Sequence, residues 1–324
     1  MVELALSSFA EGIAVTPIGS HEYEANLSED WCIGSVPHGG YVTSVILAAV
    51  SKHFATTLAK QNQPHSITLH LEFMKRTQAG PATVVVKDAK LGRQTTTIHV
   101  TLSQGGKEEI VGYITQSNIH KEDGPSFETG WAMTPDVAPK PASLQALRDG
   151  HEDPVWAEQA TMPFIEFRKA AHQARFFFPK TRVLRNVTDQ WICFRNGEKF
   201  TQDSLGYVCD MFPQMVETLR AKNDPYGLKE KAAQEQSGEK PIAKFWYPTV
   251  LLNLDVKKAL PEEGVDWLFC RIHSKQVKNG RMDLDILILD EQGDLVALSH
   301  HVALILDVSR NLVRQTPSAT SAKM

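Results

Sequence analysis

The most regular hydrophobic pattern in the chain begins directly after a pair of glycines. Apolar residues then recur every three or four positions, at Val42, Val45, Ile46, Ala49, Val50, Phe54 and Leu58. This spacing predicts one long helix with a buried apolar face. The preceding Gly39 and Gly40 either relax the backbone at the helix start or leave unpaired N–H groups open to a ligand oxygen. The pattern alone leaves both interpretations open.

Strand-like segments follow this helix, and a similar order recurs later in the chain. The first set is rich in β-branched residues and has short turns, which predicts an antiparallel meander over 66–75, 81–91, 93–104 and 108–117. The second unit has strand-like segments at 173–179 and 190–195, a helix over 202–220, and strands over 248–256, 265–277, 281–291 and 295–307. Pro213 is expected to kink or shorten the second helix.

The repeat is visible in the residues as well as in the order of elements. The segment from Gly92 is similar to the segment from Gly280, 188 residues later. A few strands can wrap a long helix only if their sheet curls around it. We therefore predict an α+β protein with two tandem domains, each a long central helix wrapped by a curved antiparallel sheet. The predicted boundaries are an N-terminal domain over 1–118, a proline-rich linker over 119–160, a C-terminal domain over 161–310 and a flexible tail over 311–324.

Composition places the chain among ordinary globular proteins. Its 324 residues are 42% hydrophobic and 22% charged, which is enough for two full cores. A net charge of −4 provides no basic surface, so we expect no nucleic-acid partner. No apolar run reaches the roughly 20 residues of a membrane span, and the N-terminus lacks the pattern of a signal peptide. The ending Ala322-Lys323-Met324 resembles a peroxisomal address, so the expected location is the cytoplasm or the peroxisome.

The four cysteines are isolated within apolar sequence, at Cys32, Cys193, Cys209 and Cys270. Without C-x-x-C or Cys/His spacing, they predict buried free thiols in a reducing compartment rather than disulfides or a zinc site. The absence of a G-x-S-x-G elbow disfavours a serine hydrolase. The absence of a glycine fingerprint likewise disfavours a Rossmann or P-loop site.

Several segments together resemble the double hotdog acyl-CoA thioesterases, the thioesterase II type and its thioesterase-like relatives. The resemblance covers 25–118 and 165–307. It rests on the Gly39-Gly40 helix start, PHSITLHLEFMKRTQAG (64–80), LGYVCD (205–210), the strand from Thr249, and GDLVALSHH (293–301). It implies tandem hotdog domains that hydrolyse an acyl-CoA or acyl-carrier thioester in lipid and fatty acid metabolism. It implies no metal or redox cofactor, with CoA only as part of the substrate, and it allows further association into a homo-oligomer.

The resemblance also implies roles for individual residues. Asp210 stands where the family has the aspartate that accepts a proton from the attacking water, and Thr249 stands where a threonine holds that water. Burial beside Cys209, Met211 and Phe212 predicts a raised pKa for the Asp210 carboxyl. The N–H groups of Gly39 and Gly40 are expected to receive the oxyanion. His38 is expected to line the same cleft or to cap the helix.

The third family position departs from the pattern, because His301 replaces a glutamine. Histidine can also orient or deprotonate a water. Its neighbour His300 is expected to point to the opposite face of the strand. The replacement keeps open a noncatalytic or specialised acyl-thioester-binding or tailoring protein. A hydratase or dehydratase of the same fold is a further alternative, although the Asp-x-Asn-x-x-His run of hydratases is absent.

Overall fold

The computed structural model describes residues 5–312 except 137, 139, 160–163, 183, 212–214 and 220–243. Some sequence predictions fall on residues outside this set. They are the kink at Pro213, the ending Ala322-Lys323-Met324 and most of the flexible tail over 311–324. These remain predictions.

The first half of the chain contains the long predicted helix and its meander. The helix is α2 (Gly39–Ala55), and the strands are β5 (His65–Phe73), β6 (Gly80–Lys90), β7 (Thr96–Gln104) and β8 (Lys107–Ser117). The sequence pattern did not indicate the other elements, which are α1 (Phe9–Gly12), β1 (Val15–Pro17), β2 (Glu22–Leu27), η1 (Glu29–Trp31), β3 (Cys32–Ile33), β4 (Val36–Pro37), η2 (Ala59–Gln61) and η3 (Ile119–Lys121).

The second half repeats the meander with additional short elements. Its strands match the predicted segments as β10 (Ala174–Pro179), β11 (Val187–Phe194), β13 (Thr249–Val256), β14 (Leu268–His273), β16 (Arg281–Leu289) and β17 (Leu295–Leu304). The short elements around them are α3 (Leu144–Gly150), β9 (Trp156–Glu158), α4 (Lys169–His172), β12 (Phe245–Trp246), β15 (Val277–Lys278), β18 (Leu306–Asp307) and α8 (Ser309–Leu312). The segment expected as a linker, 119–160, therefore contains α3 and β9, and β9 pairs with β10.

The second long helix predicted over 202–220 is wrong in its extent. The described residues form η4 (Gln202–Ser204), α5 (Leu205–Cys209) and α6 (Met215–Leu219) instead. Asp210 is the residue that ends α5, with φ −104° and ψ 3°, so it does not lie inside a helix. Pro213 lacks the N–H that would bond to the Cys209 carbonyl in a continuous helix.

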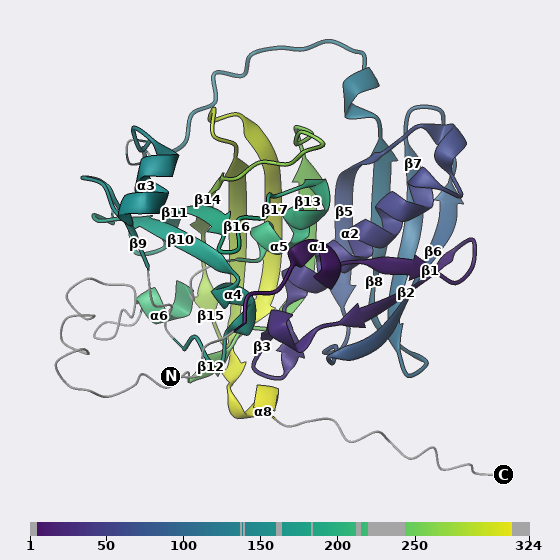
Figure 1. The fold of residues 1–324 in the computed structure, drawn as a ribbon, viewed down its shortest axis with the longest axis horizontal. Coiled ribbons are helices and arrows are strands. Elements are labelled where there is room, and N and C mark those ends of the chain that lie inside the picture. The colour runs from purple at the N-terminus through teal and green to yellow at the C-terminus, as the bar shows by residue number, and fades with distance from the viewer. Residues whose placement is uncertain are drawn as a thin grey trace.

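The two halves are joined in one antiparallel sheet (Figure 1). Its order is β1-β2-β6-β7-β8-β5-β13-β17-β16-β14-β11-β10-β9, with β15 beside β16. The junction is the pair β5 and β13, where His70 lies opposite Asn253. The edge left by one curled meander is thus covered by the edge of the other.

The halves also meet through their helices, because α2 and α5 approach each other at glycines. A Cβ on Gly40 would lie 2.4 Å from the Gly206 carbonyl oxygen, and one on Gly206 would lie 2.9 Å from the Ser44 nitrogen. The Tyr207 N–H donates to the Ser44 hydroxyl at 3.0 Å across this contact. Backbone contact of this kind places the first turn of α2 directly beside the end of α5.

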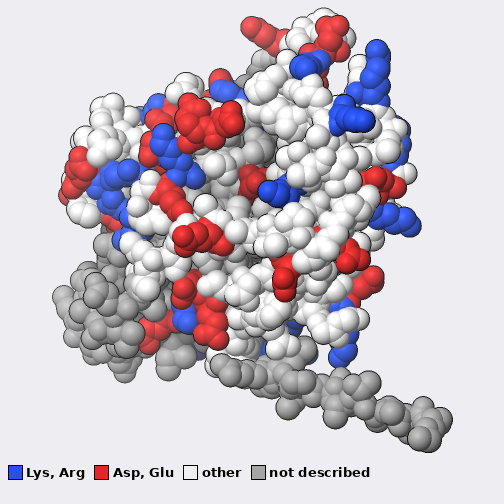
Figure 2. Space-filling view, turned by 45° about the vertical axis from the view of Figure 1, so that its right-hand side comes forward, with Lys and Arg blue, Asp and Glu red and all other residues white. Residues whose placement is uncertain are grey.

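Two further sequence predictions can be compared with the structure. All four cysteines are free and buried, as predicted. Acidic and basic side chains are interspersed on the face seen in Figure 2, so that face carries no extended basic patch. Within the described part of the chain, no helix combines the length and the apolar character that crossing a membrane requires.

Candidate active site

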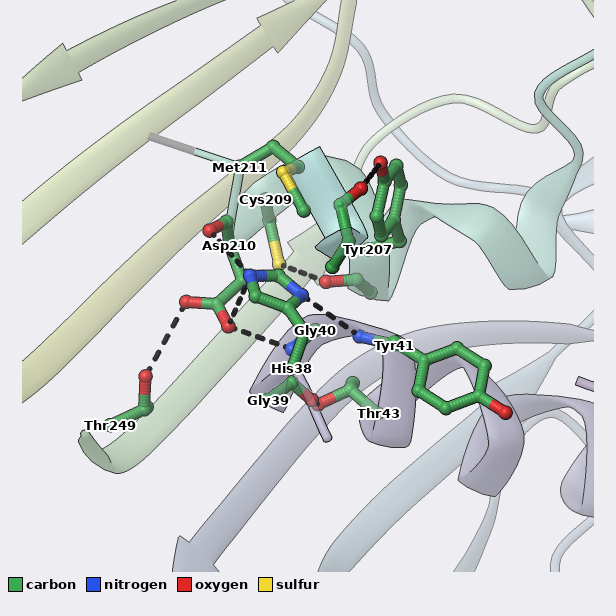
Figure 3. Close-up of polar contacts among 12 residues, drawn as sticks. His38, Gly39, Gly40, Tyr41, Thr43, Tyr207, Cys209, Asp210, Met211 and Thr249 are labelled. Atoms are coloured by element: carbon green, nitrogen blue, oxygen red, sulfur yellow. Dashed lines mark hydrogen bonds and ion pairs between the residues drawn. The ribbon is translucent and has the colours of Figure 1, made fainter. Parts of the chain in front are cut away.

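The centre of the site is the Asp210 carboxylate, which faces the N-terminus of α2 (Figure 3). Its side chain is 4% exposed, and its Oδ2 accepts a hydrogen bond from the Gly40 N–H at 2.7 Å. A Cβ on Gly39 would lie 2.9 Å from the same oxygen. Glycines at the helix start therefore let a buried carboxylate reach the positive end of the α2 dipole.

His38 holds the same carboxylate from the other side of the helix start. It is the N-cap of α2, and its Nδ1 accepts the Tyr41 N–H at 3.3 Å. This bond assigns the ring proton to Nε2, which lies 3.1 Å from the Asp210 carbonyl oxygen and 3.3 Å from Oδ2. The predicted capping role of His38 is confirmed, and the same ring also donates to Asp210.

Thr249 lies at the second carboxylate oxygen. Its hydroxyl donates to Asp210 Oδ1 at 3.4 Å, from the first residue of β13 (Figure 3). The pairing of β13 with β17 shifts register between Thr249 and Leu251. Such an irregularity turns a side chain away from the regular alternation of the strand, which suits a site at the strand end.

His301 also lies beside Oδ1, behind the carboxylate. Its Nδ1 is 3.4 Å from Asp210 Oδ1 and makes no hydrogen bond with any described residue. Its Nε2 is 2.8 Å from the Ser299 hydroxyl, which donates its own proton to the Asn253 carbonyl at 2.6 Å. The Ser299 oxygen must therefore accept from His301, which places a proton on Nε2 and leaves the Nδ1 side directed at Asp210. As predicted, His301 is buried and His300 is exposed.

The pKa of Asp210 is lowered, so the predicted raised pKa is wrong. Burial raises the pKa of this carboxyl, but the imidazole of His38, the contact with His301 and the Gly40 N–H together outweigh burial. The pKa of His38 is also lowered, because burial disfavours its charged form more than the neighbouring carboxylate favours it. The pair at neutral pH is therefore a carboxylate beside a neutral imidazole.

A cavity of about 660 Å³ opens in front of the carboxylate. His38, Gly39, Asp210 and Thr249 line it, whereas Gly40 and His301 are not among its lining residues. Its walls are largely apolar and aromatic, formed by Phe73, Met211, Phe245, Trp246, Tyr247 and Leu304. Basic residues also line it, namely Lys75, Arg76, Arg168 and Arg310. An ionised buried acid beside an apolar cavity is the arrangement expected of a site for an acyl group and a water.

The structure thus brings the sequence-predicted residues together but changes the part played by Gly40. Its N–H already donates to Asp210, whereas the prediction assigned it to a substrate oxyanion. The N–H of Gly39 has no hydrogen-bond partner among the described residues, and Gly39 lines the cavity. Sequence reasoning missed Ser299, whose only signal was a hydroxyl two residues before His301 on the same strand face.

Two family profiles match most of the chain. The acyl-CoA thioesterase N-terminal domain matches residues 27–117, and the acyl-CoA thioesterase C-terminal domain matches residues 137–305. The chain belongs to the double hotdog thioesterase family. This confirms the resemblance drawn from the sequence. The substrate class of this family is an acyl thioester.

Individual relatives agree with this membership. The chain is 38% identical to the thioesterase-like protein TwmA of Talaromyces wortmannii, over 98% of this chain and 97% of TwmA. Its fold is similar to that of acyl-CoA thioesterase II TesB2 from Mycobacterium marinum, with a TM-score of 0.61 and 15% identity over 93% of this chain and 98% of TesB2. It is also similar to a hot dog fold protein of unknown function from Alicyclobacillus acidocaldarius, with a TM-score of 0.67 and 16% identity over 93% and 99% of the two chains.

Proposed function

We propose that this thioesterase family member hydrolyses an acyl-CoA or acyl-carrier thioester by direct attack of water. The observation that carries the proposal is the ionised, buried Asp210 at the wall of the cavity, with the Thr249 hydroxyl 3.4 Å from its Oδ1. Oδ2 is already engaged by the Gly40 N–H, so Oδ1 is the oxygen available to a water. A water that lies in the cavity against both Oδ1 and the Thr249 hydroxyl would have one strong acceptor and one partner that fixes its direction.

The proposed reaction begins when Asp210 accepts a proton from this water and the hydroxide oxygen bonds to the thioester carbon. The oxyanion that forms takes a hydrogen bond from the Gly39 N–H, at the positive end of α2. The carbon–sulfur bond then breaks, and the proton on Asp210 passes to the thiolate. A carboxylic acid and a free thiol leave the site, and no metal or redox cofactor enters the reaction.

The remaining polar residues act on Asp210 rather than on the substrate. His38 is a positioning residue, because its Nε2–H bonds to Asp210 and its Nδ1 caps the helix that carries Gly39. His301 packs behind Oδ1, in the place of the family glutamine. Its ring is held by Ser299, so it presents a fixed nitrogen to the carboxylate.

The cavity lining supports an acyl substrate with a phosphate-bearing carrier. The aromatic wall near Trp246 and Tyr247 suits an acyl chain, and the basic side chains of Lys75 and Arg310 suit phosphate groups. CoA and the phosphopantetheine of a carrier protein both have such groups.

The proposal is tested with a panel of acyl-CoA and acyl-pantetheine substrates, by detection of free thiol. The wild-type protein is expected to release thiol, and Asp210→Asn is expected to abolish most of that release. The matched control is Asp203→Asn, which changes a partly buried aspartate whose partner is Ser51 and which does not line the cavity.

Two other outcomes would replace the proposal with an alternative class. Tight binding of acyl thioesters without turnover of any member would favour a noncatalytic or tailoring protein. Addition of water to an enoyl thioester without release of thiol would select the hydratase reaction.

A further inference from the structure

A second cluster of titratable groups lies in the N-terminal half, away from the cavity. His21 precedes β2, His53 is in the last turn of α2, and Asp88 is near the end of β6. His21 Nε2 lies 3.3 Å from Asp88 Oδ2, and His53 Nε2 lies 3.2 Å from Asp88 Oδ1. The three ligand atoms are all within 4.8 Å of one another. Each ring therefore directs its Nε2 atom at the Asp88 carboxylate.

The opposite nitrogen of each ring is held by a hydroxyl group. The Ser20 hydroxyl lies 2.8 Å from His21 Nδ1, and the Tyr23 hydroxyl lies 3.0 Å from His53 Nδ1. Each hydroxyl oxygen can accept a hydrogen bond from the ring Nδ1–H, which would leave both Nε2 atoms with a lone pair toward Asp88. Metal-binding histidines are oriented in this way by a partner on the second nitrogen. The cluster thus has oriented donors as well as suitable residue types.

The spacing of the donors fits a small divalent ion. Zinc bonds to imidazole nitrogen and carboxylate oxygen at about 2.0–2.2 Å, so a nitrogen and an oxygen on one ion are about 2.9 Å apart at a right angle and about 3.4 Å apart at a tetrahedral angle. The two observed nitrogen–oxygen separations fall between these values, and they end on different oxygens of Asp88, 3.3 Å from His21 to Oδ2 and 3.2 Å from His53 to Oδ1.

The cluster is also accessible from solvent on one side only. The side chain of His53 is 0% exposed, that of Asp88 is 24% exposed and that of His21 is 40% exposed. The exposed side leaves room for a water as a fourth ligand.

We propose that His21, His53 and Asp88 bind one divalent metal ion of the zinc type. The ion would fasten the end of α2 to the start of β2 and to β6, elements that lie together at one side of the molecule (Figure 1). His53 lies thirteen positions after Gly40 in α2, which is about 20 Å along a helix. The proposed role is therefore structural, and it does not depend on the proposed hydrolysis. It differs from the sequence prediction of no metal, which rested on the cysteine spacing and on the family resemblance.

The test uses the full chain after treatment with EDTA. Calorimetric titration with Zn²⁺ is expected to give about one ion per chain, and Co²⁺ is expected to give the visible absorption of a four-coordinate site. Removing one ligand by His21→Ala is expected to weaken Zn²⁺ binding at least tenfold. His21 is partly exposed, so this variant keeps the core, and Asp88→Asn serves as a second variant that leaves both rings in place.

His300→Ala is the matched control, because His300 is exposed on β17 and outside the cluster. It is expected to bind Zn²⁺ as the wild type does. Zn²⁺ should raise the melting temperature of the wild type and of this control but not of His21→Ala. No Zn²⁺ binding by the wild type, or equal binding by wild type, His21→Ala and Asp88→Asn, would overturn the proposal and leave the cluster as a hydrogen-bonded network.

Discussion

The Gly40 N–H donates to Asp210 Oδ2 at 2.7 Å, across 170 residues of sequence. This hydrogen bond joins the start of α2 to the end of α5. It occupies Oδ2 and leaves Oδ1 as the carboxylate oxygen that can contact a water. The remaining oxygen, Oδ1, faces Thr249 and His301. The geometry of the proposed reaction therefore depends on the contact between the two halves of the chain.

Asp210→Asn should lower kcat by about 10²- to 10⁴-fold, because the amide cannot accept the proton of a water. The amide oxygen can still accept the Gly40 N–H, so the fold and KM should change little. The measurement is steady-state kinetics with free-thiol detection, alongside thermal unfolding. Asp203→Asn should retain the wild-type kcat. Equal activity of wild type and Asp210→Asn would remove Asp210 from the reaction.

Gly40→Ala should destabilise the fold by about 1–3 kcal/mol, since the new methyl group has no space. The added Cβ would lie 2.4 Å from the Gly206 carbonyl and 2.6 Å from the Asp210 Cβ. Urea unfolding measures the change. Gly150→Ala is the control, because Gly150 is also helical and a Cβ there meets nothing within 4 Å. An equal free energy of unfolding for Gly40→Ala and Gly150→Ala would show that α2 and α5 can move apart without loss of stability.

The main helix and the meanders could be predicted because their apolar spacing is local. The strand β2 was missed, although Tyr23, Ala25 and Leu27 alternate with polar residues, because its outward residues are two glutamates and an asparagine. The second helix was extended too far because apolar periodicity continues past Asp210. Nothing in that periodicity shows that α5 ends where Asp210 meets α2.

The site could be predicted as a set of residues but not as a set of bonds. The sequence analysis predicted that the Gly40 N–H would bind a substrate oxygen. In the structure this N–H donates to an oxygen of Asp210. The direction of the Asp210 pKa also depends on His38, which is 172 residues away. The cluster of His21, His53 and Asp88 has no motif, since its members come from three separate elements. Contacts of this kind are set by the tertiary fold.

His301→Gln should retain hydrolysis within about tenfold of the wild-type rate, because an amide can also support the carboxylate and its water. Ser299→Ala should reduce kcat about fivefold in the wild-type background, the effect of one hydrogen bond of about 1 kcal/mol. The same Ser299→Ala change should have a smaller effect when combined with His301→Gln, since the His301–Ser299 bond is then already absent. A double-mutant cycle on kcat measures this coupling. Additive effects of the two changes would show that Ser299 does not act through His301.

The unfolding free energy should fall steeply in acid, partly through Asp210. The pKa of this carboxyl is below its usual 3.8 in the folded chain, so near pH 3.8 and below the unfolded chain binds the proton more readily. The stabilisation is therefore complete above this range and is lost as the pH falls through the folded pKa. Urea unfolding between pH 7 and pH 3 should show a shallower acid loss for Asp210→Asn than for wild type.

His38 acts in a separate and higher pH range, which allows the two groups to be distinguished. Burial lowers the pKa of His38 from 6.5, so the unfolded chain takes up this proton first as the pH falls below 6.5. His38→Gln should therefore flatten the loss of stability that begins below pH 6.5, and it should also reduce the loss near pH 3.8, because His38 helps to lower the pKa of Asp210. The reverse pattern, with His38→Gln flattening only the loss near pH 3.8, would contradict a neutral His38 beside an ionised Asp210.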